Sequence, residues 1–186
     1  MKTDKEKNEN VPFNRTYWVA PGRFLAGCYP GSEEKDKAYQ QLKALLDHGI
    51  RHVINLMEPD ESNWDMKPFV PYEDQMKSIA ESMDVEVAFN RFPIRDMWVC
   101  SSAEMIQILN RIDQSIEGGK PVYIHCWGGR GRTGTVVGCY LTRHGFAVER
   151  NVLKLIQELR RNTEDRDRPS PQTSQQIEMV QAWRDR

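Results

Sequence analysis

Residues 125–134, with the sequence HCWGGRGRTG, bring a cysteine and two arginines together in a run that also holds four glycines. Glycine lets a backbone approach a ligand closely, and successive backbone N–H groups in such a loop can surround an anion. Arg132 follows Cys126 by six residues, which is enough chain to curl the guanidinium back to the sulfur. The pattern predicts either a turn that happens to contain Cys126 or a loop that wraps an anion and aims a thiol at it.

The elements expected on either side favour the anion-binding loop. KPVYIHC (120–126) is typical of a short buried strand, and TGTVVGCYLTRHG (133–145) is typical of a helix. A strand, a glycine-rich turn and a helix direct the helix N-terminus at one point, which favours a bound phosphate. The same field stabilises a thiolate, and the planar fork of an arginine grips two phosphate oxygens. We therefore expect Cys126 to act as a nucleophile and Arg132 to bind phosphate.

Transfer of a phosphoryl group to a thiolate also requires a proton donor for the leaving oxygen. Composition alone leaves several aspartates as candidates. Asp96 lies in FPIRDMWV (92–99), thirty residues before the cysteine. Asp60 is its nearest rival, because it also follows an expected strand and sits beside a proline.

The segment VYIHCWGGRGRTG resembles the His-Cys-x5-Arg-Thr/Ser-Gly signature of the cysteine-dependent protein-tyrosine and dual-specificity phosphatases. FPIRDMWV resembles the mobile general-acid loop of that family, which implies that Asp96 is the acid. The resemblance covers roughly residues 17–183, and the compact chain is closer to dual-specificity enzymes than to the larger tyrosine-specific ones. It implies a cysteinyl-phosphate intermediate and no metal or organic cofactor.

The resemblance assigns further roles around the cysteine. Thr133 resembles the hydroxyl that assists breakdown of the intermediate, although threonine is also a natural helix-start residue. His125 is expected to hydrogen-bond the loop and support the thiolate rather than act as a base. The phosphate-binding loop is expected to comprise Trp127, Gly128, Gly129, Arg130, Gly131 and Arg132.

Two further groups of residues have open roles. SPQTSQQIEMV (170–180) resembles a Gln-Thr-x-x-Gln segment that positions the hydrolytic water, with Gln172 and Gln176 at that spacing, but it also reads as an ordinary capped helix start. An oxidised Cys126 could form a protective disulfide with another cysteine, as in some relatives. The candidates are Cys28, Cys100 and Cys139.

Arg130 leaves the substrate class open, because it places a second cation inside the loop. Two guanidiniums favour a substrate with several phosphates, whereas an Arg130 that points outward would only raise the local potential. We expect a phosphorylated protein to be the substrate, hydrolysed by a protein-tyrosine or dual-specificity phosphatase. A phosphoinositide or inositol polyphosphate is the alternative, and a phosphate-binding module with weak turnover is the second alternative.

The bulk properties exclude several other classes. The chain has 186 residues and a net charge of −1, so its overall charge does not favour binding to nucleic acid. No apolar run approaches the ~20 residues that span a bilayer. The start, MKTDKEKNEN, lacks the apolar core of a signal peptide, so we expect a cytoplasmic protein with free thiols. The cysteines show no zinc-like spacing. Oligomeric state has no signature in the sequence.

Strand and helix patterns alternate along the chain and predict an α/β fold. We expect residues 1–14 to be a disordered segment and residues 15–186 to form a single domain, whose mostly parallel sheet is flanked by helices. The phosphate-binding loop would lie between a strand end and a helix N-terminus, where ligands of such sheets bind. Strands are expected within 17–27, 51–56, 85–92 and 120–126. Helices are expected at 32–49, capped by Ser32, at 72–83, at 102–119, with Ile106 on its apolar face, and at 133–145, 147–161 and 174–183.

Overall fold

The computed structural model describes residues 10–147 and 150–184. Their central element is a five-stranded sheet with the order β1-β2-β5-β3-β4, in which β1 and β2 are antiparallel and all other neighbours are parallel. The strands are β1 (Thr16–Ala20), β2 (Phe24–Gly27), β3 (His52–Asn55), β4 (Ala88–Arg91) and β5 (Val122–His125). The expected mostly parallel sheet is confirmed.

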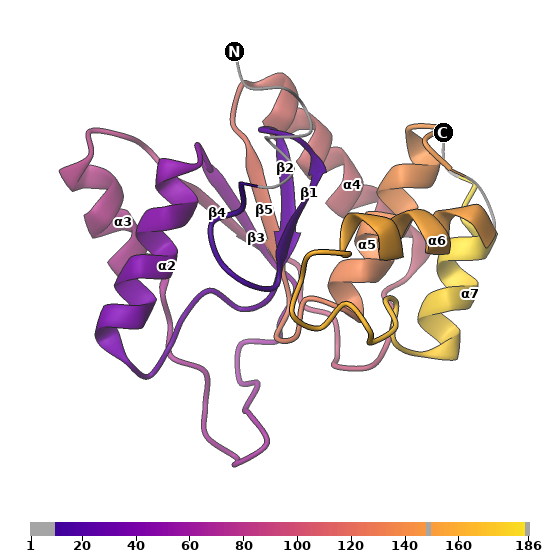
Figure 1. The fold of residues 1–186 in the computed structure, drawn as a ribbon, viewed down its shortest axis with the longest axis horizontal. Coiled ribbons are helices and arrows are strands. Elements are labelled where there is room, and N and C mark those ends of the chain that lie inside the picture. Colours follow the sequence, from indigo (N-terminus) through magenta and orange to yellow (C-terminus); the bar gives the residue numbers. More distant parts are fainter. Residues whose placement is uncertain (1–9, 148–149, 185–186) are drawn as a thin grey trace.

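Helices cover both faces of this sheet, as Figure 1 shows. The helices are α2 (Lys35–Asp47), α3 (Glu73–Ser82), α4 (Ser102–Glu117), α5 (Arg132–Arg143), α6 (Arg150–Leu159) and α7 (Ser174–Ala182). Helices α2 and α3 pack on one face, and α4 to α7 lie on the other. The expected α/β class with flanking helices is therefore confirmed.

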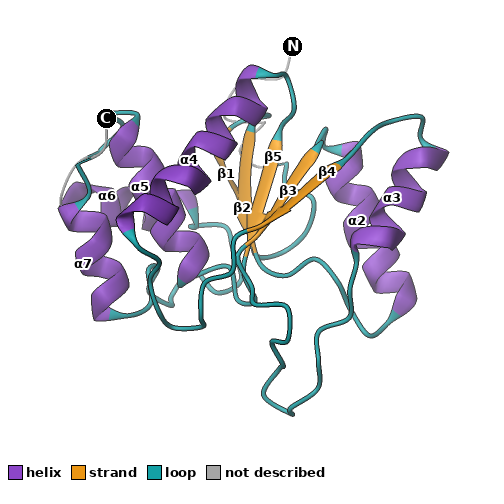
Figure 2. Cartoon of the chain, turned by 180° about the vertical axis from the view of Figure 1, so that it is seen from behind, coloured by secondary structure: helices purple, strands orange, loops and turns teal. Residues whose placement is uncertain are grey.

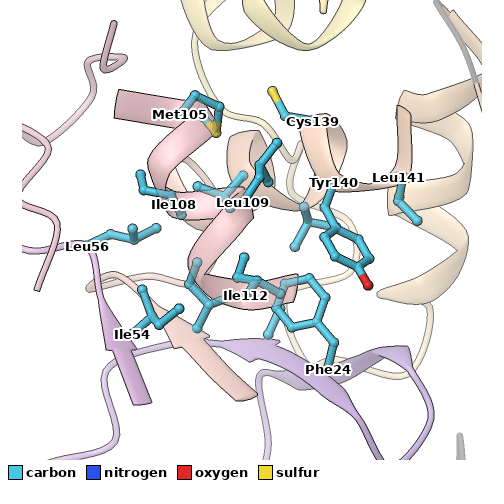
Figure 3. Close-up of a cluster of buried hydrophobic side chains, with 14 of the residues drawn as sticks. Phe24, Ile54, Leu56, Met105, Ile108, Leu109, Ile112, Cys139, Tyr140 and Leu141 are labelled. Atoms are coloured by element: carbon cyan, nitrogen blue, oxygen red, sulfur yellow. The ribbon is translucent and has the colours of Figure 1, made fainter. Parts of the chain in front are cut away.

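The alternation of side chains along the strands builds one hydrophobic core on each face. In β5, Val122 and Ile124 join the core beneath α4 and α5, whereas Tyr123 joins the core beneath α2 and α3. Phe24 of β2 and Ile112 of α4 meet in the first of these cores, which Figure 3 shows in close-up. Helix α5 is buried from Arg132 to Thr142, because helices α4, α6 and α7 also pack against it.

Three details differ from the sequence-based predictions. Ser32 does not cap α2. The N-cap is Glu34, and the Ser32 hydroxyl, two residues before it, accepts a hydrogen bond from the Glu34 N–H at 3.1 Å. Ile106 is 36% exposed, while Ile108 is fully buried. The buried face of α4 therefore contains Met105, Ile108, Leu109 and Ile112, and does not include Ile106 as predicted. The strand expected at 85–92 is shorter and spans only β4.

Residues 1–9, most of the segment expected to be disordered, lie outside the described residues. Residues 10–14 contact the domain, since the indole of Trp18 donates to the carbonyl of Asn10 at 3.0 Å and Thr16 donates to the carbonyl of Phe13 at 2.6 Å. The division at residue 15 stays a prediction. Among the described residues, no helix combines the length and the apolar character that a bilayer crossing requires.

The parallel strands place three loops at one edge of the sheet. Strands β3, β4 and β5 point the same way, so the loops that follow them start from neighbouring strand ends. These loops cover residues 56–72, 92–101 and 126–131, and Figure 2 shows loops gathered beyond that edge. Residues that are far apart in the sequence can therefore meet there.

Candidate active site

The phosphate-binding loop connects the end of β5 to the start of α5. Cys126 directly follows β5, and Gly131 is the N-cap of the helix that begins at Arg132. Gly129 has a φ of 72°, and a Cβ there would lie 2.6 Å from the backbone carbon of Gly27. Only glycine fits at this position, because the loop presses against the end of β2. The predicted strand, glycine turn and helix N-terminus are confirmed as structure.

His125, the last residue of β5, supports the phosphate-binding loop through its ring. Its ring is fully buried, with Nε2 2.6 Å from the Tyr72 hydroxyl and Nδ1 3.3 Å from the carbonyl oxygen of Cys126. Burial lowers the pKa of His125 to about 3; the Cys126 contact opposes this shift, and the charges of Arg91 and Arg132 add to it. The imidazole is therefore neutral near pH 7, which suits a supporting residue better than a proton carrier.

The Arg132 guanidinium is held by four oxygens. Nη1 and Nη2 donate to the two carboxylate oxygens of Glu61, each at 2.7 Å, and Nη1 also donates to the carbonyl of Ile94 at 2.9 Å. Nη2 forms an ion pair with Oδ1 of Asp96 at 2.9 Å. Burial alone would lower the pKa of Arg132, but the Glu61 hydrogen bonds and the charges of Cys126, Glu61 and Asp96 hold it above its ordinary value.

The edge of this guanidinium that carries Nε and Nη2 is the edge that a phosphate can bind. Nε of Arg132 is buried and has no hydrogen-bond partner among the described residues. The neighbouring Nη2 is reached by Asp96, whose side chain is 43% exposed. Nε and Nη2 form one side of the planar fork, so a phosphate that displaces Asp96 can be gripped there by two parallel hydrogen bonds.

The structure separates Asp96 from its rival. Asp96 lies on the loop after β4 and lines the same cavity as Cys126 and Arg132. Asp60 is exposed on the loop after β3, and it is not among the residues that line the cavity. The predicted acid thus lines the same cavity as the predicted nucleophile, and its role stays a prediction.

The other predicted site residues divide between the cavity and its supports. Thr133 is fully buried, and its hydroxyl lies 3.5 Å from the carbonyl of Gly27. Gln172 lines the cavity. Gln176 is fully buried: its Oε1 accepts from the N–H groups of Gln172 and Thr173, and its Nε2 donates to the carbonyl of Trp98. Gln176 thus completes the capping box of α7, whose N-cap is Thr173, and Gln172 is left as the glutamine that can meet a water in the cavity.

The cavity has a volume of about 610 Å³, within the usual range for small-ligand sites. Trp127 and Trp64 form one side, with ring centroids 4.9 Å apart, and Trp64 is 86% exposed. Arg130 lines the cavity as well, with a side chain only 15% exposed, so it does not simply point outward.

Several site residues escaped the sequence analysis: Glu61, Tyr72, Arg15, Asp165 and Arg168. A signal for Glu61 was present, since a carboxylate on the loop after one parallel strand lies at the same sheet edge as the loop after its neighbour. Arg15 and Asp165 carry no such signal, because they come from loops whose course the strand pattern does not determine.

The remaining cysteines are free thiols in the described structure. Burial raises the pKa of both Cys28 and Cys100 to about 11, and Cys139 is fully buried in the core. A disulfide with Cys126 is therefore not present, and its formation under oxidation stays a prediction. Among the described residues, no three His, Cys, Asp or Glu side chains gather as metal ligands would.

Comparison with known proteins agrees with this geometry. The family described as "PTP-SAK: Swiss Army Knife protein, DSP-PTPase phosphatase domain" matches residues 13–186. Protein tyrosine phosphatase domain-containing protein 1 of Mus musculus is 30% identical over 125 residues, which cover 67% of this chain and 16% of that protein. Dual specificity protein phosphatase CDC14B of Mus musculus is 29% identical over 147 residues, which cover 75% and 26%. The chain thus spans less than a third of these relatives.

Solved structures show the same fold. Kinase associated phosphatase, in a form with serine in place of its catalytic-site cysteine, aligns with a TM-score of 0.69 at 16% identity, over 92% of this chain and 93% of that one. The order of the elements, the Cys126–Arg132 loop and the family match lead to one conclusion. The chain belongs to the DSP-PTPase phosphatase domains of the PTP-SAK family, which are compact dual-specificity-type members of the cysteine-dependent tyrosine phosphatase superfamily.

Proposed function

We propose that this chain hydrolyses phosphate monoesters through a cysteinyl-phosphate intermediate. One observation carries the proposal: Cys126, Arg132 and Asp96, from different segments, line a single cavity, and Asp96 Oδ1 lies 2.9 Å from Arg132 Nη2. A site that only bound phosphate would not need a carboxylate there, since a second negative charge weakens the binding of a dianion.

The first step transfers the phosphoryl group to sulfur. The Cys126 thiolate attacks phosphorus, an S–P bond forms, and the P–O bond to the leaving group breaks. Arg132 and the N–H groups of the loop hold the phosphoryl oxygens, where preorganised donors stabilise the charge of the transition state. Protonated Asp96 gives its proton to the leaving oxygen.

The second step releases phosphate. Water attacks phosphorus, Asp96 accepts a proton from that water, and the S–P bond breaks to restore the thiolate. Gln172 lines the cavity and can orient this water, and Thr133 assists departure of the sulfur. His125 and the remaining loop residues position these groups rather than exchange protons.

A phosphorylated protein is the proposed substrate, with phosphotyrosine and phosphothreonine both accepted. The open cavity supports dual specificity, because the cavity mouth is lined by the exposed side chains of Trp64 and Met97. A phosphorylated inositol is the second candidate, since Arg130 adds a cation to the cavity wall. A cytoplasmic location belongs to the same proposal.

The test is kcat/KM on a phosphotyrosine peptide, a phosphothreonine peptide and an inositol phosphate. Cys126→Ser, folded and matched in concentration, is the blank. We expect turnover that falls by about 10³-fold or more in the variant, as removal of a covalent nucleophile does. No turnover above the blank on any substrate would overturn the proposal and leave a phosphate-binding module.

A further inference from the structure

Three arginines from separate segments line the cavity that holds Cys126. Arg15 precedes β1, Arg130 belongs to the phosphate-binding loop, and Arg168 lies on the loop between α6 and α7. We propose that they form a second anion subsite, which binds the second phosphate of a small polyol, such as an inositol ring, with phosphates on neighbouring carbons. The proposal rests on the proposed phosphatase chemistry and adds a further activity to the same site.

A single carboxylate places two of these arginines. Oδ2 of Asp165 lies 3.8 Å from Nε of Arg15 and 3.7 Å from Nε of Arg130. Its Oδ1 lies 3.0 Å from Nη2 of Arg160, whose side chain is only 1% exposed. Arg160 also donates to the backbone carbonyl of Arg168 at 3.0 Å, so the loop that carries this third arginine rests on the same buried group.

Asp165 positions Arg15 and Arg130 at the cavity wall, but it does not hydrogen-bond their Nε atoms. The two Nε–Asp165 distances exceed hydrogen-bond length, and Oδ2 of Asp165 has no hydrogen-bond partner among the described residues. In residues 10–147 and 150–184, the Arg130 side chain contacts a carboxylate only through Nε. Arg130 itself lines the cavity, and phosphate oxygens bind guanidinium groups in pairs.

The carboxylates at this wall are Asp165 and Glu164, whose Oε1 lies 4.0 Å from Nε of Arg15, and they are outnumbered by Arg15, Arg130, Arg160 and Arg168. Burial lowers the pKa of Arg130; the charges of Arg168, Arg160 and Arg15 lower it further, and Asp165 is the opposing influence. A wall with mutually repelling cations gains more from a bound dianion than one whose charges are already matched. This electrostatic imbalance agrees with the geometry of the subsite.

The two subsites share one cavity, which suits two phosphates carried by one small molecule. Arg130 and Arg132 are two residues apart on one loop, and Arg15 Nη2 donates to the carbonyl of Gly128 in that loop at 2.8 Å. Both subsites therefore open into the same cavity of about 610 Å³. A ring with phosphates on neighbouring carbons offers both at once, whereas a peptide would have to insert two phosphorylated side chains together.

Arg168→Ala tests the subsite, because this exposed side chain lies outside the phosphate-binding loop and its removal leaves Cys126, Arg132 and Asp96 in place. We expect wild-type kcat/KM to be at least tenfold higher on a myo-inositol bisphosphate with vicinal phosphates than on a myo-inositol monophosphate. Arg168→Ala is expected to raise KM for the bisphosphate by about 10- to 100-fold, as loss of a charged hydrogen bond does, with kcat unchanged. Turnover of the monophosphate is expected to stay within about twofold.

Arg166→Ala is the matched control, since Arg166 is exposed on the same loop but does not line the cavity. Arg130→Ala is a second test and should remove the preference for the bisphosphate. Equal losses on both substrates, or no loss in Arg168→Ala, would overturn the subsite. A loss confined to a doubly phosphorylated peptide would overturn the assignment to a polyol.

Two further measurements separate this proposal from the phosphatase proposal. Wild-type turnover of p-nitrophenyl phosphate that depends on Cys126, without preference for the bisphosphate, overturns the subsite alone. Absence of Cys126-dependent turnover on every substrate overturns the phosphatase chemistry as well. Phosphatidylinositol bisphosphate in phosphatidylcholine vesicles, compared with the free inositol bisphosphate, then shows whether the ring is used free or attached to lipid.

Discussion

Arg132 and Glu61 form a two-point ion pair, in which both terminal nitrogens of the guanidinium donate to the two carboxylate oxygens at 2.7 Å. Glu61 thereby occupies one side of the fork and fixes its plane. The opposite edge, with Nε and the side of Nη2 near Asp96, is left for phosphate. We therefore expect Glu61 to position the arginine without contacting the substrate.

Replacement of Glu61 tests this positioning role. We expect Glu61→Ala to lower the free energy of unfolding by about 3 kcal/mol, because it leaves the buried Arg132 with fewer charge partners. A misplaced guanidinium should also lower kcat/KM by about 10- to 100-fold. Denaturant unfolding and steady-state kinetics measure the two effects. Glu61→Gln, which keeps some hydrogen bonds, should lose less, and an Arg132 that binds phosphate normally in Glu61→Ala would contradict the role.

Replacement of Asp96 by asparagine is expected to weaken catalysis and to strengthen the binding of inorganic phosphate. Asp96→Asn removes the proton donor, so kcat should fall by about 10²- to 10⁴-fold. It also removes the carboxylate that competes for Arg132 Nη2, so inorganic phosphate should inhibit at a lower concentration. Asp60→Asn is the control and should change neither quantity, because Asp60 is exposed away from the cavity. Weaker phosphate inhibition in Asp96→Asn would show that the ion pair does not form in solution.

The sequence predicted the phosphate-binding loop well because that chemistry is concentrated in ten consecutive residues. The strand before Cys126, the helix from Arg132 and the position of Asp96 after a parallel strand all follow from local patterns. Local patterns also explain the error at Ser32, since a residue able to cap a helix can instead hydrogen-bond within the preceding turn.

The parts of the site that sequence analysis missed depend on long-range packing. Asp165 takes its role from Arg15 and Arg130, which come from the other end of the chain and from the phosphate-binding loop. Gln176 fits its predicted spacing, yet its amide oxygen accepts from the Thr173 N–H at the start of α7 and its amide nitrogen donates to the Trp98 carbonyl. The amide is therefore not available to a water in the cavity. The sequence shows which residue types are present and how they are spaced. The paths of the loops decide which of their atoms come into contact.

Gln176 is expected to couple the last helix to the acid loop. Gln176→Ala removes the capping interactions of α7 and the hydrogen bond to the Trp98 carbonyl at 3.1 Å. The free energy of unfolding should fall by about 1–3 kcal/mol, since buried backbone groups lose their partners. Because Trp98 belongs to the loop of Asp96, kcat should fall more than KM changes. Gln175→Ala, exposed on the same helix, should leave stability and kinetics unchanged; equal effects in the two variants would contradict the coupling.

His125 should make the fold less stable in mild acid. Its pKa falls from 6.5 to about 3 in the folded state, so between those values the unfolded chain binds a proton that the folded chain does not. The free energy of unfolding is therefore fully retained above pH 6.5 and decreases as the pH falls toward 3, by about 1.4 kcal/mol per pH unit for one proton. His52, whose pKa is also lowered by burial, adds to the decrease in the same direction.

His125→Gln isolates the contribution of that imidazole, because glutamine does not titrate in this range. Urea unfolding at several pH values from 7 to 4 gives the slope for each protein. We expect the variant to be less stable at pH 7, since the contact with the Tyr72 hydroxyl is disturbed, but to lose stability with falling pH less steeply than the wild type. Parallel slopes in the two proteins would mean that His125 is protonated in the folded state, and its neutral supporting role beneath Cys126 would then be wrong.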